Sequence, residues 1–210
     1  MKNITFLLFL VSLIFAAACS DKKVANTKPV SNAASPEVKK GVAPIADDEI
    51  AVIEMENAAY GTIKMELYSN IAPKMVARFK ELAKEGYYDG IIFHRVNPSV
   101  IQAGNADTKP GRTLNPAKEG DSGKPNVAGE FSDIPYDTGI LGAARLSDPN
   151  SANAQFFITL KREPGFDNKY TIFGKVIDGM NNVRTIAGVP KDGEKPQEPV
   201  RIKHISIAAK

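Results

Sequence analysis

Gln155-Phe156-Phe157-Ile158-Thr159-Leu160 alternates its side chains between two faces, with the period of a β-strand. Phe156, Ile158 and Leu160 share one face, and Gln155, Phe157 and Thr159 share the other. If the first face fills a core, Phe157 stands on the opposite face beside a polar amide, which suits a shallow peptide-binding groove. The pattern leaves a second interpretation equally open, in which a loop covers Phe157.

Segments on both sides of this stretch have the period of strands or helices. Apolar residues at helical spacing predict helices over residues 72–85 and 178–186, and Pro73 and Gly86 mark the two ends of the first. Strands are expected over residues 50–55, 63–67, 91–96, 100–103, 140–145, 155–160, 170–176 and 200–207. Because the strands do not alternate with helices, we predict a mainly β fold: a closed eight-stranded antiparallel β-barrel capped by two α-helices.

The N-terminus has the layout of a secretory signal peptide. Lys2 precedes an apolar run, residues 4–15, that is too short to span a membrane, and three alanines then lead to Cys19. We predict a signal peptide over residues 1–18 and lipidation of Cys19, as at a bacterial lipobox, although Ala16 stands where leucine is usual. The alternative is ordinary signal-peptidase cleavage after Ala18, which would leave a free thiol.

The composition then changes twice along the chain. Residues 20–48 are rich in Ser, Asn, Lys, Ala and Pro without an apolar period, so a disordered tether is predicted over residues 19–48. The folded domain is expected over residues 49–210, and it includes a Gly-, Pro-, Asn- and Asp-rich segment, residues 105–138, of a kind that is functional or mobile.

Charge and cysteine content exclude some classes of protein. The formal net charge is +3, and loss of Lys2 with the signal peptide leaves +2, so nothing supports a nucleic-acid partner. The single cysteine cannot form an intramolecular disulfide. His94 and His204 have no clustered Cys or Asp at metal-ligand spacing, so we expect no metal and no cofactor.

A series of motifs runs in one order from Ile50 to Ile207. It contains Phe93-His94-Arg95-Val96, Gly139-Ile140-Leu141, Ala144-Arg145, Gln155-Phe156-Phe157-Ile158 and Phe173-Gly174-Lys175-Val176. This series resembles the cyclophilin family of peptidyl-prolyl cis/trans isomerases, particularly its bacterial members. The resemblance implies an isomerase that assists the folding of exported proteins and binds their Pro-containing segments.

The resemblance also implies roles for single residues. Arg95 matches the catalytic arginine, although a surface ion pair is the commoner use of an arginine in general. The residues that match substrate-binding positions of the family are Phe93, Val100, Gln102, Ala144, Arg145, Gln155, Phe157, Phe166 and Tyr170. Among these, Gln102 and Gln155 match residues that position the peptide, and Phe157 and Phe166 match the walls of the proline pocket.

The chain departs from the family in three places, one of which is Gly165, where cyclosporin-sensitive members have tryptophan. Arg95 and Gln102 are seven positions apart where the family has eight, and the aromatic residue lost near Ser99 normally forms the pocket floor. The loop between Gln102 and Phe131 is also longer than usual. These departures keep a second function open, a cyclophilin-like module that binds Pro-containing segments or an envelope or host partner with little turnover.

A hydrolase is a third possible function. Gly120-Asp121-Ser122-Gly123-Lys124-Pro125 resembles the nucleophile motif of trypsin-like proteases, and His94 and Asp107 precede it in the matching order. The context of His94 and the short distance from Asp107 to Ser122 argue against it, and a turn within the long loop is the simpler interpretation. We therefore expect a monomeric isomerase, held by its lipid to a membrane of the bacterial cell envelope, facing the periplasm or the cell surface.

Overall fold

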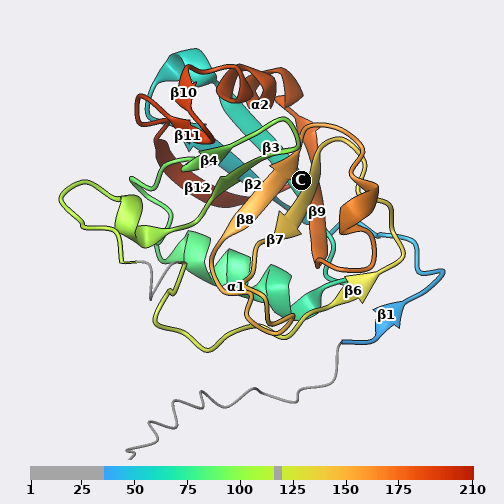
Figure 1. The fold of residues 1–210 in the computed structure, drawn as a ribbon. Helices are drawn as coiled ribbons and strands as arrows, with labels where there is room; N and C mark the ends of the chain where they lie inside the picture. Colours follow the sequence, from blue (N-terminus) through green and yellow to red (C-terminus); the bar gives the residue numbers. More distant parts are fainter. Residues whose placement is uncertain (1–35, 116–119) are drawn as a thin grey trace, which may run out of the picture. The chain divides into compact units, whose positions relative to one another are not determined.

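An eight-stranded antiparallel sheet dominates the computed structural model, which describes residues 36–115 and 120–210. The strand order is β12-β2-β3-β9-β7-β8-β5-β4, and the two helices lie at opposite ends of the sheet (Figure 1). The strands are β2 (Glu49–Met55), β3 (Thr62–Leu67), β4 (Arg95–Val96), β5 (Val100–Ala103), β7 (Ile140–Ala143), β8 (Phe156–Thr159), β9 (Ile172–Asp178) and β12 (Ile202–Ala209).

The helices are α1 (Pro73–Lys84) and α2 (Met180–Ala187), with short 3-10 turns η1 (Ala58–Tyr60), η2 (Ala106–Thr108) and η4 (Pro164–Phe166). Two small strand pairs stand outside the large sheet: β1 (Val38–Lys39) with β6 (Phe131–Ser132), and β10 (Lys191–Asp192) with β11 (Lys195–Pro196). The predicted mainly β class with two helices is confirmed.

The sheet is open and curled, so the prediction of a closed barrel is wrong. Among the described residues the end strands β4 and β12 share no ladder. The chain approaches β12 only before β4 begins, where Phe93 N donates to Val200 O (3.0 Å) and Ile202 N donates to Ile91 O (2.8 Å). Because only Arg95 and Val96 of the expected strand 91–96 are extended and paired along β5, the end strand is too short to close the ring.

The main core is built between one face of the sheet and the two helices, and α2 contributes Val183 and Ile186 to it. Pro73 starts α1, and the helix buries one face that includes Phe79. The Phe79 ring lies 5.3 Å from Tyr88, 5.5 Å from Phe156 and 5.4 Å from Phe173, measured between centroids. The backbone N–H groups of Lys74 and Met75, in the first turn of α1, donate to the Glu130 carboxylate at 3.2 and 3.0 Å. A side chain outside the helix thus satisfies two N–H groups that have no partner within it.

The opposite face of the sheet has a smaller apolar cluster of its own. Phe156 and Ile158 of β8 belong to the main core, whereas Phe157 belongs to this second cluster together with Val100 and Tyr136. The alternation expected for residues 155–160 is therefore confirmed. It gives the domain two separate apolar surfaces, of which one is enclosed by α1 and the other by loops.

Residues 38–47, which the sequence predicts to be part of the tether, contact the folded domain. β1 pairs with β6 in parallel, and Lys39 Nζ donates to Ile71 O at 2.6 Å. Further on, Ile45 N donates to Asn70 Oδ1 (3.0 Å), and Asp47 accepts from Lys80 Nζ of α1 (2.7 Å). The predicted signal peptide, Cys19 and the tether up to residue 35 lie outside the described residues.

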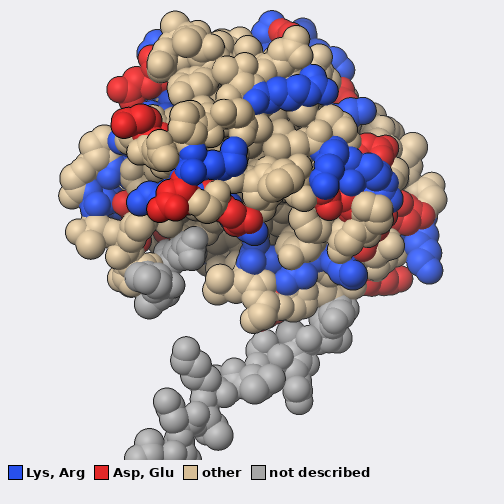
Figure 2. Space-filling view, turned by 45° about the horizontal axis from the view of Figure 1, so that its top comes forward, with Lys and Arg blue, Asp and Glu red and all other residues tan. Residues whose placement is uncertain are grey.

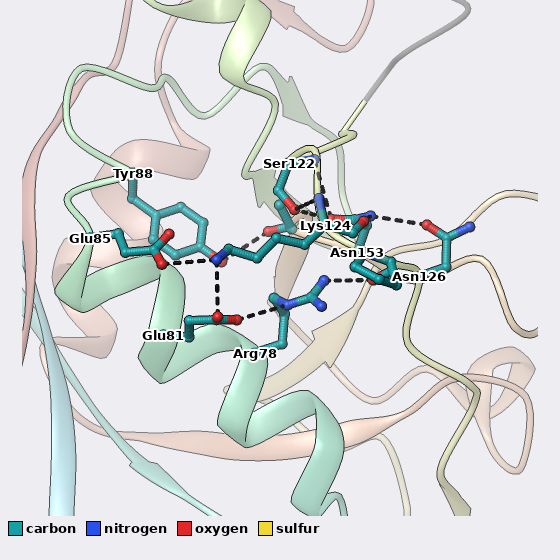
Figure 3. Close-up of polar contacts among 10 residues, drawn as sticks. Arg78, Glu81, Glu85, Tyr88, Ser122, Lys124, Asn126 and Asn153 are labelled. Carbon is teal, nitrogen blue, oxygen red and sulfur yellow. Dashed lines mark hydrogen bonds and ion pairs between the residues drawn. The ribbon is translucent and has the colours of Figure 1, made fainter.

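Charged side chains attach residues 124–125 of the long loop to α1 and to Glu85, which follows it (Figure 3). Lys124 Nζ lies between Glu81 (2.9 Å) and Glu85 (2.8 Å), and Arg78 Nη1 donates to Pro125 O (2.8 Å). Ser122 Oγ donates to Asn153 Oδ1 at 2.5 Å, so its proton is directed to an amide oxygen and not to an imidazole. The protease-like motif is a turn that anchors the loop.

The aromatic packing around Phe79 generates a stability prediction. Phe79→Ala should lower the free energy of unfolding by about 3–5 kcal/mol, because it removes a fully buried ring that contacts three others. Urea unfolding followed by circular dichroism measures the loss. Leu146→Ala is the control, because Leu146 is exposed and should change stability by less than about 0.5 kcal/mol. Equal stabilities of the two variants would contradict this description of the core.

Candidate active site

Three of the predicted site residues lie in one row across neighbouring strands. Arg95 of β4 is paired with Gln102 of β5, and Gln102 is paired in turn with Phe157 of β8. Directly paired residues of adjacent strands project from the same face of a sheet. The pairing therefore brings a cation, an amide and an aromatic ring together on the face opposite the main core.

Gln155 joins this row through its side chain. Gln102 Nε2 donates to Gln155 Oε1 at 2.7 Å, so the two predicted peptide-positioning amides form one hydrogen-bonded pair. The long loop packs against the same pair, because a Cβ atom added to Gly120 would lie 2.3 Å from Gln155 Nε2. The amides are thus held from two sides and retain partial exposure.

Phe157 is covered, which answers the question that the sequence left open. Its side chain is 4% exposed and its ring rests on Gly142, where a Cβ atom would lie 2.3 Å from the ring edge. Its centroid lies 5.8 Å from that of Tyr136, 5.5 Å from Phe166 and 5.9 Å from Tyr170. Phe166 and Tyr170 are the partly exposed members of this cluster, so they form its open side.

Tyr136 is a member of the site that sequence reasoning missed. It stacks on Phe157 and is completely buried, and burial raises the pKa of its hydroxyl well above the ordinary value. It lies in the long Gly- and Pro-rich segment, which has no apolar period that could have identified it. Only the position of the folded loop relative to β8 brings the ring to Phe157.

Ala144 and Arg145 follow β7 directly. Ala144 N donates to Gln155 O (3.0 Å), which extends the pairing with the strand beside it. The Arg145 guanidinium lies 4.5 Å from the centroid of the Tyr170 ring, a cation–π arrangement, and its Nη2 donates to Lys169 O (2.9 Å). Arg145 therefore supports Tyr170 at the open side of the aromatic cluster.

Two other predicted residues have different surroundings. Val100 is buried in the same second cluster as Phe157, and it is paired with Thr159 of β8. Phe93 has no exposed surface and lies in the main core, 6.3 Å from the Phe156 ring. The structure thus places Phe93 away from the row of Arg95, Gln102 and Phe157, because the irregular chain before β4 turns the ring inward under the sheet.

The shortened stretch between Arg95 and Gln102 forms a tight turn. Asn97 Oδ1 accepts from both Ser99 N and Val100 N at 2.9 Å, and Asn97 N donates to Val100 O at 3.0 Å. The asparagine side chain thus closes the turn at the place where the family has an additional aromatic residue.

Arg95 makes an ion pair with a residue that the sequence did not identify. Arg95 Nε donates to Glu194 Oε2 at 2.5 Å, and Nη2 lies 3.4 Å from Oε1. Asn97 Nδ2 donates to the same carboxylate at 2.8 Å. The hydrogen bonds from Arg95 and Asn97 hold the pKa of the Glu194 carboxyl below its ordinary value. Because 99 positions separate the two residues, no local pattern could have paired them.

Charge on the surface is mixed. On the face in Figure 2, Lys and Arg side chains are interspersed with Asp and Glu over the described residues. Within residues 36–115 and 120–210, no group of three His, Cys, Asp or Glu side chains could hold a metal ion. The same part of the chain contains no helix that is long and apolar enough to cross a bilayer.

Known proteins are similar to this chain in both sequence and fold. Residues 52–207 match the family model described as cyclophilin type peptidyl-prolyl cis-trans isomerase. A probable peptidyl-prolyl cis-trans isomerase of Brucella suis is 41% identical over 155 residues, which cover 71% of this chain and 79% of the relative. A peptidyl-prolyl cis-trans isomerase of Schizosaccharomyces pombe is 39% identical over 160 residues, covering 73% and 96%.

A solved structure agrees with these relatives. The cyclophilin type isomerase of Cryptosporidium parvum, crystallised in the presence of the dipeptide Ala-Pro, superposes with a TM-score of 0.66 at 31% identity. The match covers 77% of this chain and 99% of that structure. The chain therefore belongs to the cyclophilin-type peptidyl-prolyl cis-trans isomerases, and it is an enzyme of that class.

Proposed function

We propose that this isomerase acts on X-Pro bonds of exported polypeptides and that Arg95 donates a hydrogen bond to the prolyl nitrogen. The observation that carries the proposal is the row formed by Arg95, Gln102 and Phe157 across three strands. In that row the cation is about half exposed at the edge strand, the amides stand in the middle, and the aromatic cluster lies at the far end.

Cis/trans isomerisation of an X-Pro bond requires little more than an oriented hydrogen-bond donor and a pocket for the proline. Rotation about the X-Pro bond faces a barrier of about 18–20 kcal/mol because amide resonance is lost midway. The prolyl nitrogen then recovers a lone pair and accepts a hydrogen bond, and a donor that reaches it only in the twisted state lowers the barrier without tightening the ground state. Arginine remains protonated at all working pH values, so it supplies such a donor.

The aromatic cluster would hold the proline ring while the rest of the peptide turns. Phe166 and Tyr170 offer the accessible surface, and Phe157 and Tyr136 lie behind them. Gln102 and Gln155 would bind the backbone beside the proline. A binding module with low turnover remains the second candidate, because the Asn97 turn lacks the additional aromatic residue and Phe157 is almost completely covered.

Arg95 can be tested by substitution. Arg95→Ala should lower kcat/KM on a short X-Pro peptide by about 10²- to 10³-fold, the usual effect of losing one oriented donor. Stability should change by less than about 1 kcal/mol, because the side chain is half exposed. Lys64→Ala is the control, since Lys64 is a similarly exposed cation in a surface ion pair on β3. Unchanged turnover in Arg95→Ala would exclude the catalytic role, and very low turnover in the wild type would favour the binding module.

Phe157 and Phe166 should have different effects when they are truncated. Phe157→Ala should cost about 3–5 kcal/mol of unfolding free energy, because the ring is covered by three aromatic neighbours. Phe166→Ala should instead raise KM for the peptide with a smaller loss of stability, because Phe166 is partly exposed. Urea unfolding and steady-state kinetics measure both effects. A fully stable Phe157→Ala protein would show that Phe157 lines an open groove.

We further propose that the enzyme is a lipoprotein of the bacterial cell envelope, anchored through Cys19 and working as a monomer. The support is the sequence alone: a basic start, an apolar run over residues 4–15, and small residues before the single cysteine. The lipid would attach the domain to a membrane through residues 19–37, which precede its first strand.

Replacement of the cysteine tests the anchor. Cys19→Ser should move the protein from the membrane fraction to the soluble exported fraction, without any change in turnover on a short peptide. Mass spectrometry of the wild type should find a mature chain that starts at an acylated Cys19. A mature chain with an unmodified thiol would refute the lipoprotein proposal and leave the enzyme unaffected.

A further inference from the structure

The position of the Arg95 guanidinium is set from a distant part of the chain. Glu194 lies in the tight hairpin formed by β10 and β11, where Lys191 pairs with Pro196 and Asp192 with Lys195. Gly193 has a φ of 59°, a left-handed conformation that favours glycine and lets the hairpin reverse just before Glu194. The hairpin therefore fixes the backbone position of Glu194.

That backbone is itself attached to the catalytic strand. Val96 N donates to Glu194 O at 2.7 Å, so the residue after Arg95 is bonded to the residue whose side chain binds Arg95. Asn97 then donates to the Glu194 carboxylate at 2.8 Å. Three consecutive residues of the β4 segment thus contact one residue of the hairpin, which fixes the carboxylate relative to the guanidinium.

The carboxylate occupies one edge of the guanidinium and leaves the remainder available. A guanidinium has five N–H groups in a rigid plane. Glu194 engages Nε and Nη2, so both N–H groups of Nη1 and one of Nη2 remain for other partners. Two contacts along one edge fix the orientation of the plane, which a single contact would not.

Orientation matters because the substrate nitrogen becomes an acceptor only in the twisted state. A donor that is already fixed does not have to reorganise when that lone pair appears, and such preorganisation accounts for much of the rate enhancement in polar active sites. A mobile arginine at the edge of a sheet would spend most of its time in solvent.

We propose that Glu194 is a positioning residue of the isomerase: it holds the Arg95 guanidinium by one edge so that the other edge faces the substrate. The inference rests on the proposed role of Arg95 as the donor. In the opposite role, Glu194 would compete against the substrate for Arg95, and the experiment separates the two roles by the sign of the effect.

The experiment compares three variants with the wild type. Glu194→Gln should lower kcat about tenfold and change KM less than twofold, because it removes the charge-assisted contact and leaves the pocket intact. Glu194→Asp should recover part of the loss, since it restores a carboxylate. Glu54→Gln is the matched control: Glu54 is a similarly exposed carboxylate, paired with Lys203 on β12, and its loss should leave kcat unchanged.

The pH dependence adds a readout that a purely structural role would not move. The pKa of Glu194 lies below its ordinary value of 4.5 in the folded protein. A lowered carboxyl pKa means that the ion pair is complete at neutral pH and is lost only as the pH falls through the lowered value. The ratio of wild-type kcat to that of Glu194→Gln should therefore stay constant between pH 6 and 8 and shrink toward one only as the pH falls through the lowered pKa of Glu194.

Nuclear magnetic resonance reports the orientation directly. The Arg95 Nε–H signal, assigned by its absence in Arg95→Ala, should be resolved in the wild type and in Glu54→Gln, and should be lost or shifted in Glu194→Gln. A double variant of Arg95→Ala and Glu194→Gln should be no slower than Arg95→Ala alone.

The outcomes separate this inference from the proposed function. Unchanged kcat in Glu194→Gln, with Arg95→Ala inactive, overturns the positioning role alone. A higher kcat in Glu194→Gln overturns it in favour of competition. Full activity of Arg95→Ala shows that Arg95 is not the donor, and the role of Glu194 falls with it.

Discussion

The pairing of β8 between β5 and β7 is the constraint on which the domain depends. Phe156 and Ile158 enter the main core, and Phe157 enters the second cluster on the other face. A shift of one residue would exchange these faces and separate Phe157 from both Gln102 and Gly142. The same ladder therefore specifies the packing under α1 and the row of side chains in the candidate site, so fold and candidate site cannot vary independently at this strand.

The site is also organised by a division between apolar and charged contacts. The aromatic end is enclosed by Tyr136 and supported by Arg145 over Tyr170, whereas the cationic end stands at the short edge strand and depends on a hairpin from near the C-terminus. Salt does not screen the apolar contacts of the buried aromatic end. The ion pair of Arg95 with Glu194 at the cationic end is exposed, so salt screens it. The two ends of the candidate site thus rest on different physical forces.

Periodicity predicted the parts of this molecule that repeat along the chain. The strands around residues 50–67 and 155–160 and the helix from Pro73 follow directly from alternating or helical spacing. The closed barrel was wrong because closure depends on the irregular chain around Phe93, which has no period. Tyr136 and Glu194 could not be predicted, since one lies in an aperiodic loop and the other meets Arg95 across 99 positions. The roles of Arg95 and the glutamines came from the family resemblance, and the register explains how they can act together.

The attachment of residues 38–47 has a consequence for reach. The contacts of this segment include the two-residue pair of β1 with β6, hydrogen bonds from Lys39 to Ile71 O and from Ile45 N to Asn70, and the ion pair of Asp47 with Lys80. Tension on an anchored N-terminus would load these contacts before any strand of the large sheet. An extended chain spans about 3.3–3.6 Å per residue. Release of residues 38–47 would therefore lengthen the connection between the domain and an N-terminal anchor by roughly 35 Å. If the N-terminus is anchored as proposed, the domain would have a short reach while residues 38–47 are attached and a longer one after their release, with the large sheet still folded.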